Sequence, residues 1–161
     1  PRVRLESIKS LMHISGDQAK DLLISVISDN DSQVRIQAVK GLASLNHKKA
    51  VQPLIEFIRQ EGFKKLEFAE KKEFFEALGK LGANEVVPFL KNIYTKRPWF
   101  SRSAYEEFRI CAIYGLGKTG TDDALSVLQG LKEKPGSKIE NIRLRAITEI
   151  KNSMGRPASH S

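Results

Sequence analysis

Five basic side chains recur at one position of successive, similar segments in this 161-residue chain. They are Arg4, Arg35, Lys71, Arg109 and Arg143, which we call the basic ladder. A row of cations can bind anions such as phosphates, or it can bind carboxylates and carbonyls of the protein itself. We expect the second, structural role, because one cation per repeat suits the interface between neighbouring repeats. Asp31, four residues before Arg35, is expected to pair with it or to cap its helix.

A second group of residues with binding chemistry lies in the segment "TKRPWFSRSAYEEFR", residues 95–109, which interrupts the spacing of the repeats. Pro98 should end the helix that precedes it. An exposed Trp flanked by Arg is typical of a binding hot spot, but the same aromatics can fold back and fill the gap between repeats. The sequence leaves both interpretations open. The candidate partner-binding residues are Lys91, Tyr94, Arg97, Trp99, Phe100 and Arg102.

Residues that could catalyse a reaction or bind a metal are sparse. The three histidines, His13, His47 and His160, are isolated from one another, and Cys111 is the single cysteine. One cysteine forms neither an internal disulfide nor a multi-cysteine metal site, and we expect Cys111 to be buried. The stretch "GLGKTG" lacks the spacing of a phosphate-binding loop. We therefore assign no catalytic residue, no metal site and no cofactor, and we expect a protein that is not an enzyme.

Helices must position these side chains. "VRLESIKSL", residues 3–11, is matched thirty-one residues later by "VRIQAVKGL", residues 34–42, with apolar residues at three- and four-residue steps. A second helical face follows at Val51, Leu54, Ile55 and Ile58. Each unit is therefore predicted to be a helix, a tight turn and a second helix, with about nine helices of roughly 10–16 residues in all. The turns are expected at Gly16, Asn46, Gly82 and Gly120, in left-handed backbone conformations.

The repeated pattern V-R-x-x-A-[apolar]-x-x-L, followed by a turn and A-[apolar]-x-x-L, resembles HEAT repeats. More narrowly, it is similar to the short bacterial HEAT-like units shared with phycobilisome lyases. The resemblance implies an all-α, right-handed α-solenoid of stacked antiparallel helix pairs, with about four and a half repeats. We expect a single array over residues 1–152, the 95–109 segment as an inserted basic and aromatic connection, and a flexible tail over 153–161. The repeats are expected at about 1–30, 31–62, 67–95 and 104–134, with a half repeat at 138–152.

The concave surface of such a solenoid is lined by the second helices of the pairs. Reading the repeat register gives its expected solvent-facing residues: Asp21, Ser25, Ser28, Gln52, Glu56, Arg59, Val87, Lys91, Tyr94, Ser126, Gly130 and Glu133. This row is mixed in sign, whereas a groove that follows phosphates concentrates Lys and Arg. The net charge of +8 is therefore expected mainly on loops, outer helices and the tail.

Composition limits the remaining possibilities. The apolar runs are short, so no membrane span is expected. The chain starts at Pro1, almost directly on a repeat, which suggests a fragment of a larger bacterial protein, and the single cysteine suits the cytoplasm. The leading hypothesis is a protein–protein interaction scaffold whose partner is another protein. The alternatives are a nucleic-acid-associated module similar to the HEAT-like alkylpurine DNA glycosylases, favoured by the pI of about 9.7, and a bilin-lyase-like enzyme.

Overall fold

The computed structural model describes residues 2–12, 16–96 and 102–155, with Met12 and Arg102 described by their backbone alone. The described residues form nine α-helices and three short 3₁₀ helices and contain no strand. The α-helices are α1 (Arg2–Met12), α2 (Asp17–Ser25), α3 (Ser32–Ser44), α4 (Val51–Arg59), α5 (Phe68–Gly82), α6 (Val87–Thr95), α7 (Arg102–Thr119), α8 (Asp122–Gly130) and α9 (Lys138–Met154). The 3₁₀ helices are η1 (Lys48–Ala50), η2 (Glu61–Lys65) and η3 (Ala83–Val86).

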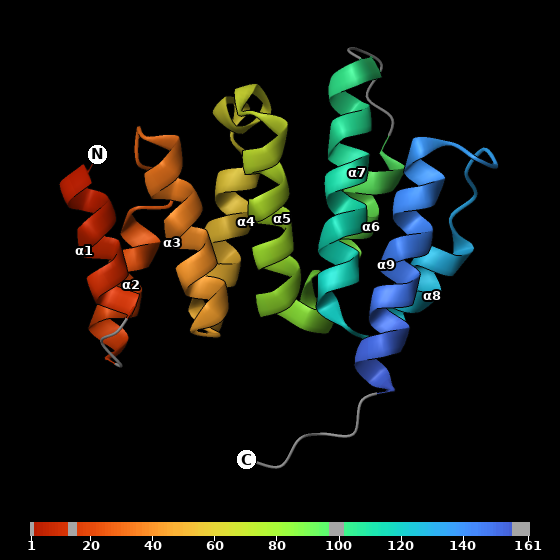
Figure 1. Cartoon of the computed structure of the whole chain (residues 1–161). Coiled ribbons are helices and arrows are strands. Elements are labelled where there is room, and N and C mark those ends of the chain that lie inside the picture. The colour runs from red at the N-terminus through yellow and green to blue at the C-terminus, as the bar shows by residue number, and fades with distance from the viewer. Residues whose placement is uncertain (1, 13–15, 97–101, 156–161) are drawn as a thin grey trace.

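The helices are arranged in two layers (Figure 1). The odd-numbered helices stand side by side in one layer, and the even-numbered helices form the second layer behind them. Each odd-numbered helix contacts the next odd-numbered helix, and each even-numbered helix contacts the odd-numbered helix that follows it in the chain. The predicted all-α class of stacked, HEAT-like helix pairs is therefore confirmed. The α-helices are 9 to 18 residues long, a wider range than expected.

The core runs between the two layers and from one pair to the next. On α3, the side chains of Val34, Ala38 and Leu42 are completely buried, as their three- and four-residue spacing predicts. Ala112, which holds the position of Ala38 on α7, is also completely buried. Small residues at this position let neighbouring helices approach closely.

Two of the four predicted left-handed turn residues are correct. Asn46 has φ of 50° and Gly120 has φ of 65°. At the third turn the positive φ belongs to Ala83 (42°), while Gly82 has φ of −90°. Gly82 is needed for space instead, because a Cβ there would lie 2.2 Å from Cγ1 of Val86. Gly16 is in an extended conformation (φ −80°) as the N-cap residue of α2, so its role is to start a helix rather than to end one.

The segment before α5 contributes to a buried aromatic cluster that the repeat pattern did not predict. Phe63, on η2, is 1% exposed. Its ring centroid lies 5.4 Å from that of Phe74 and 6.0 Å from that of Phe108, and Phe57 and Phe75 complete the cluster. These edge-on contacts between aromatic rings join the second, third and fourth helix pairs.

The connection between α6 and α7 is shorter than the expected 95–109 segment. Helix α7 already begins at Arg102, because its first two turns have packing partners. Phe108 packs edge-on against Phe75, with ring centroids 6.0 Å apart, and Tyr105 bonds to α6. Those contacts extend the helix to the N-terminal side of Arg109, so residues 102–109 are part of a helix rather than of a loop.

Candidate functional site

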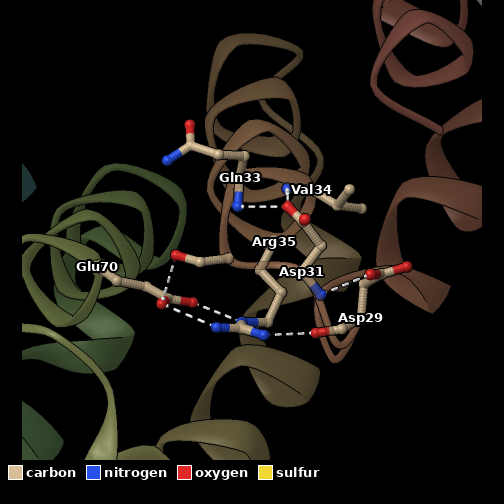
Figure 2. A network of polar contacts seen from close by, with 7 residues as sticks. Asp29, Asp31, Gln33, Val34, Arg35 and Glu70 are labelled. Carbon is tan, nitrogen blue, oxygen red and sulfur yellow. Dashed lines mark hydrogen bonds and ion pairs between the residues drawn. The ribbon is translucent and has the colours of Figure 1, made fainter. Parts of the chain in front are cut away.

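Arg35 shows the geometry of the basic ladder (Figure 2). This side chain on α3 is buried, and it lies between two neighbouring helix pairs. Its Nε donates to Oε1 of Glu70 at 2.5 Å, its Nη2 donates to Oε2 of Glu70 at 2.9 Å, and its Nη1 donates to the Asp29 carbonyl at 2.6 Å. The hydroxyl of Ser32 also donates to Glu70. The bidentate hydrogen bond to Glu70 raises the pKa of Arg35, so this cation remains charged.

Asp31 caps α3 and does not pair with Arg35. Its carboxylate accepts from the backbone N–H groups of Gln33 at 2.9 Å and Val34 at 3.2 Å. Of the two roles expected for Asp31, the cap is correct and the ion pair is wrong. The carboxylate that Arg35 binds belongs to the next odd-numbered helix, 35 residues further along the chain, where local spacing gives no signal.

The other ladder residues are also bonded within the chain. Lys71, on α5, donates to Glu107 of α7 at 2.9 Å. Arg109 donates to Glu133, and Arg143 donates to the Leu128 carbonyl at 2.9 Å. Arg4 donates to Asp29 at 3.2 Å, but its side chain is half exposed. The ladder residues therefore bind carboxylates and carbonyls of their own or a neighbouring unit, which leaves little of the ladder free for an outside anion.

The predicted partner-binding residues fall into two groups. Lys91 is exposed on α6, as expected, whereas Tyr94 is 6% exposed. Tyr94 was expected on the solvent-facing row, and that expectation is wrong because its ring packs against Arg109. Arg97, Trp99 and Phe100 lie outside the described residues, as do His13, His160 and the side chain of Arg102.

Tyr94 belongs to a cluster that holds the two ends of the α6–α7 connection together. Its hydroxyl accepts from Nη2 of Arg109 at 2.8 Å, and its carbonyl accepts from the hydroxyl of Tyr105 at 2.8 Å. The Arg109 guanidinium also lies over both rings, 4.5 Å from the centroid of Tyr94 and 5.6 Å from that of Tyr105. Stacking and hydrogen bonds together fix the last turn of α6 against the first turn of α7.

The expected solvent-facing row on the even-numbered helices is mostly correct. Asp21, Ser25, Ser28, Gln52, Glu56, Arg59, Lys91, Ser126 and Gly130 are exposed. Val87, at 5%, is buried, as Tyr94 is, and Glu133 is partly buried because it binds Arg109. On α6 the exposed residues are instead Pro88, Lys91, Asn92 and Thr95. Helices α4 and α6 share one register, because each follows a 3₁₀ helix (η1 and η3) and starts with a buried valine, Val51 or Val87. The expected exposed residues of α6 were therefore each placed one position too early.

The structure adds a charged groove that the sequence did not indicate. The groove has a volume of about 470 Å³ and crosses α3, α5, α7 and α9 over a floor of small residues such as Ala43 and Gly117. Ion pairs join neighbouring helices along it, from Lys40 to Glu73 at 3.0 Å and from Lys118 to Glu149. The charges sit on helices far apart in sequence, so only stacking reveals that they form one surface.

Residues with reactive or ligating side chains give no site in the described part of the chain. Cys111 is completely buried, as predicted, and burial raises the pKa of its thiol to about 12. His47 is buried beside Asp21, with 3.2 Å between Nε2 and Oδ1. Over residues 2–12, 16–96 and 102–155 there is no group of three or more His, Cys, Asp or Glu side chains that could hold a metal ion. None of the helices in that part has the length and apolarity that crossing a membrane requires.

Comparison with known proteins identifies the repeats. The family model of HEAT repeats matches residues 1–70, which hold the first two helix pairs. No curated protein sequence matches the chain. Helices α5 to α9 continue the paired, two-layer arrangement of the matched segment. Over residues 1–70 the chain is similar to HEAT repeats.

Proposed function

We propose that this protein is a non-enzymatic protein–protein interaction module that binds its partner around the α6–α7 connection. HEAT repeats generally mediate such interactions, and their stacked helices present a rigid, extended surface. The proposed location of the binding site rests on one observation. Contacts among Tyr94, Tyr105 and Arg109 fix both ends of the connection, beside the exposed Lys91. A short segment with anchored ends loses less conformational entropy on binding than a free loop does.

The proposed binding residues are Lys91 on α6 and Arg97, Trp99, Phe100 and Arg102 of the connection and its C-terminal flank. Trp and Arg are the residue types that most often contribute strongly to binding. Tyr94 is no longer among them as a contact residue. We propose that Tyr94 holds the connection in position and does not contact the partner. Its hydroxyl is hydrogen-bonded to Arg109, and its ring is covered by the same guanidinium. We place the module in the cytoplasm as part of the same proposal, since a single buried cysteine needs no oxidising compartment.

A pull-down with a double variant tests the proposal. Trp99→Ala with Phe100→Ala should release a protein partner that the unchanged chain recovers from its host. The matched control is Lys48→Ala with Lys49→Ala, at exposed positions of the turn within the second helix pair, which should keep the partner. Thermal melts must accompany both variants. A double variant that stays folded and keeps its partner contradicts the proposed site, and one that melts much earlier shows that the aromatics fill a gap in the stack.

Nucleic acid is the second candidate partner, favoured by the net charge of +8. Lysines at the turns between pairs, Lys65, Lys96, Lys132 and Lys134, are exposed and would meet phosphates. The two candidates respond differently to salt. Affinity that comes from phosphate contacts falls steeply as salt rises, whereas an interface anchored by aromatic residues changes little. A bilin-lyase activity receives no support from any placement of carboxylates or of Cys111 in the described residues.

A further inference from the structure

The connection between α8 and α9, residues 131–137, is tied to α7 by the carboxylate of Glu133. Nη2 of Arg109, on α7, donates to this carboxylate, and the same nitrogen donates to the hydroxyl of Tyr94 on α6 at 2.8 Å. Two acceptors that share one donor nitrogen lie close together. The α8–α9 connection and the C-terminal end of α6 therefore meet at Arg109, and α6 also contacts α8.

Glu133 takes the place of an acid that α9 lacks. Arg35 and Lys71 each bind a glutamate that lies one or two residues before the next ladder residue along the chain. The two residues before Arg143 are Asn and Ile, so no acid of α9 stands at those positions. Arg109 binds Glu133 of the connection instead, and this charge-assisted contact holds the connection against the stack.

Glu133 points inward, whereas the lysines on both sides of it point outward. The side chain of Glu133 is 9% exposed. The backbone enters the connection in an extended conformation, with φ of −74° and ψ of 132° at Leu131, and successive side chains of an extended segment point to opposite sides. Lys132 and Lys134 are accordingly both exposed. The inward contact of Glu133 thus fixes two cations on the outer side of the connection.

The second acid near this connection is also engaged by the protein. Glu140, in the first turn of α9, accepts from the backbone N–H of Gly136 at 2.6 Å, and its side chain is 18% exposed. In sequence, residues 131–140 mix three lysines with two glutamates, and folding leaves only the lysines exposed. The exposed charged side chains of this stretch are therefore all positive, namely Lys132, Lys134 and Lys138.

The end of α6, which Arg109 joins to this connection, presents positive charge as well. Lys91 and Lys96 are exposed, three residues before and two residues after Tyr94. Glu106 is the one exposed acid among residues 91–96 and 103–109, the described residues on either side of the α6–α7 connection. The two regions that meet at Arg109 therefore carry more exposed lysines than exposed acids, and the resulting local field attracts anionic groups.

Connections between helix pairs stay exposed when further pairs follow. Lys96 is exposed although α8 and α9 follow it, and Lys65, in the connection before α5, is exposed although five α-helices follow it. The exposure of Lys132 and Lys134 is therefore a property of this edge of the stack, and it does not depend on whether another pair follows α9.

We propose that the α8–α9 connection and the C-terminal end of α6 form one docking surface for an extended, acidic segment of the partner protein. Carboxylates of this segment bind Lys91, Lys96, Lys132 and Lys134. The inference rests on the proposed function, since it concerns the protein bound around the α6–α7 connection, and it adds the chemistry of that partner and a second connection to the site. Complementary charge of this kind orients a partner and speeds its association.

A protein segment suits this surface better than a nucleic acid does. The phosphates of a nucleic-acid strand are bound along a continuous groove of cations. The even-numbered helices before and after α6 carry exposed acids, namely Glu56 on α4 and Asp122 and Asp123 on α8, so exposed cations and acids alternate along that layer. An acidic peptide segment needs only the local cluster of lysines.

A fluorescein-labelled peptide of alternating Glu and Gly is the probe, and the same peptide with Gln in place of Glu is its control. In an anisotropy titration with the full chain, the Glu peptide should bind and the Gln peptide should not. Lys132→Gln with Lys134→Gln should weaken binding about tenfold, and Lys91→Gln with Lys96→Gln should weaken it by a similar factor, because each double variant removes two exposed ion pairs.

The matched control is Lys48→Gln with Lys49→Gln, which removes the same charge at exposed positions of the turn within the second helix pair. It should change the affinity by less than about twofold, since it leaves all four proposed contacts in place. An equal loss of affinity in this control and in the variant of Lys132 and Lys134 overturns the proposal, by showing that net charge alone matters. Unchanged affinity of the variant of Lys132 and Lys134 overturns it as well.

A single-stranded oligonucleotide with the net charge of the Glu peptide separates the two classes of partner. Tighter binding of the oligonucleotide, lost in the same lysine variants, would overturn the proposal in favour of nucleic acid. The titration uses purified protein, so its result does not depend on recovering a partner from the host. A recovered protein partner that binds the unchanged chain and the Lys132→Gln, Lys134→Gln variant equally contradicts this inference alone. Failure to recover any protein partner contradicts the proposed function, whatever the titration shows.

Discussion

Gly79 on α5 lies against Gly115 on α7 with no room for a side chain between them. A Cβ placed on Gly79 would lie 2.0 Å from the carbonyl oxygen of Gly115. The two backbones therefore touch directly at the centre of the stack, and both residues are glycine because any larger residue would separate the third and fourth helix pairs.

Gly79→Ala should destabilise the fold by about 1–3 kcal/mol or more, the usual cost of overpacking, even though alanine favours helices. Chemical denaturation followed by circular dichroism measures the effect. Gly130→Ala is the matched control, because Gly130 also lies in a helix but a Cβ there meets nothing within 4 Å. It should leave stability unchanged or raise it by up to about 1 kcal/mol. Equal effects of the two substitutions would show that α5 and α7 are not in backbone contact.

Glu70→Ala should cost about 3–5 kcal/mol, since it leaves the buried guanidinium of Arg35 without its carboxylate. Arg4→Ala removes a ladder residue whose side chain is 51% exposed and should cost less than about 1 kcal/mol. Urea denaturation of both variants gives the comparison. The double change Arg35→Met with Glu70→Leu should recover much of the loss, because apolar residues of similar size can replace a buried ion pair. If Arg4→Ala lowered the free energy of unfolding as much as Glu70→Ala, burial would not determine how strongly the ion pairs of the ladder stabilise the fold.

Leu42→Ala should lower the free energy of unfolding by about 2–5 kcal/mol through the cavity it leaves in a completely buried site. Gln37→Ala, on the same helix but only partly buried, should change it by less than about 0.5 kcal/mol. Comparable losses of stability for the two variants would show that the face of α3 that we assign to the core is not the buried one.

Glu76 should make the protein less stable as the pH rises through the mildly acidic range. Burial raises the pKa of this carboxyl above its ordinary value of 4.5. The folded state then holds the proton to a higher pH than the unfolded state does, so ionisation of Glu76 opposes folding above that interval. Glu76→Gln keeps the size and removes the charge. The melting temperature of this variant, relative to the unchanged protein, should be higher at about pH 7.5 than at about pH 4. The exposed Glu106→Gln serves as control and should show no such difference.

The repeat and the helix faces could be read from the order of the residues. Apolar residues at three- and four-residue steps predicted the buried faces of α3, where Ala38 and Leu42 are both completely enclosed. The exposed side of α4 followed from the same register. These features depend on contacts within one helix or between the two helices of a pair, and the periodicity of the α-helix relates them directly to sequence spacing.

The partners of the ladder could not be read in that way. Arg35 binds the carboxylate of Glu70, 35 residues away, because stacking of the helix pairs brings Glu70 to its guanidinium. The nearby Asp31 does not bind Arg35, because its carboxylate caps α3. Tyr94 holds the repeat position of buried Ile58, so its burial follows from the register. Its contacts with Arg109 and Tyr105 depend instead on the early start of α7. Contacts between units depend on how closely the helices approach, and that distance is set by the packing of the whole stack rather than by any local pattern.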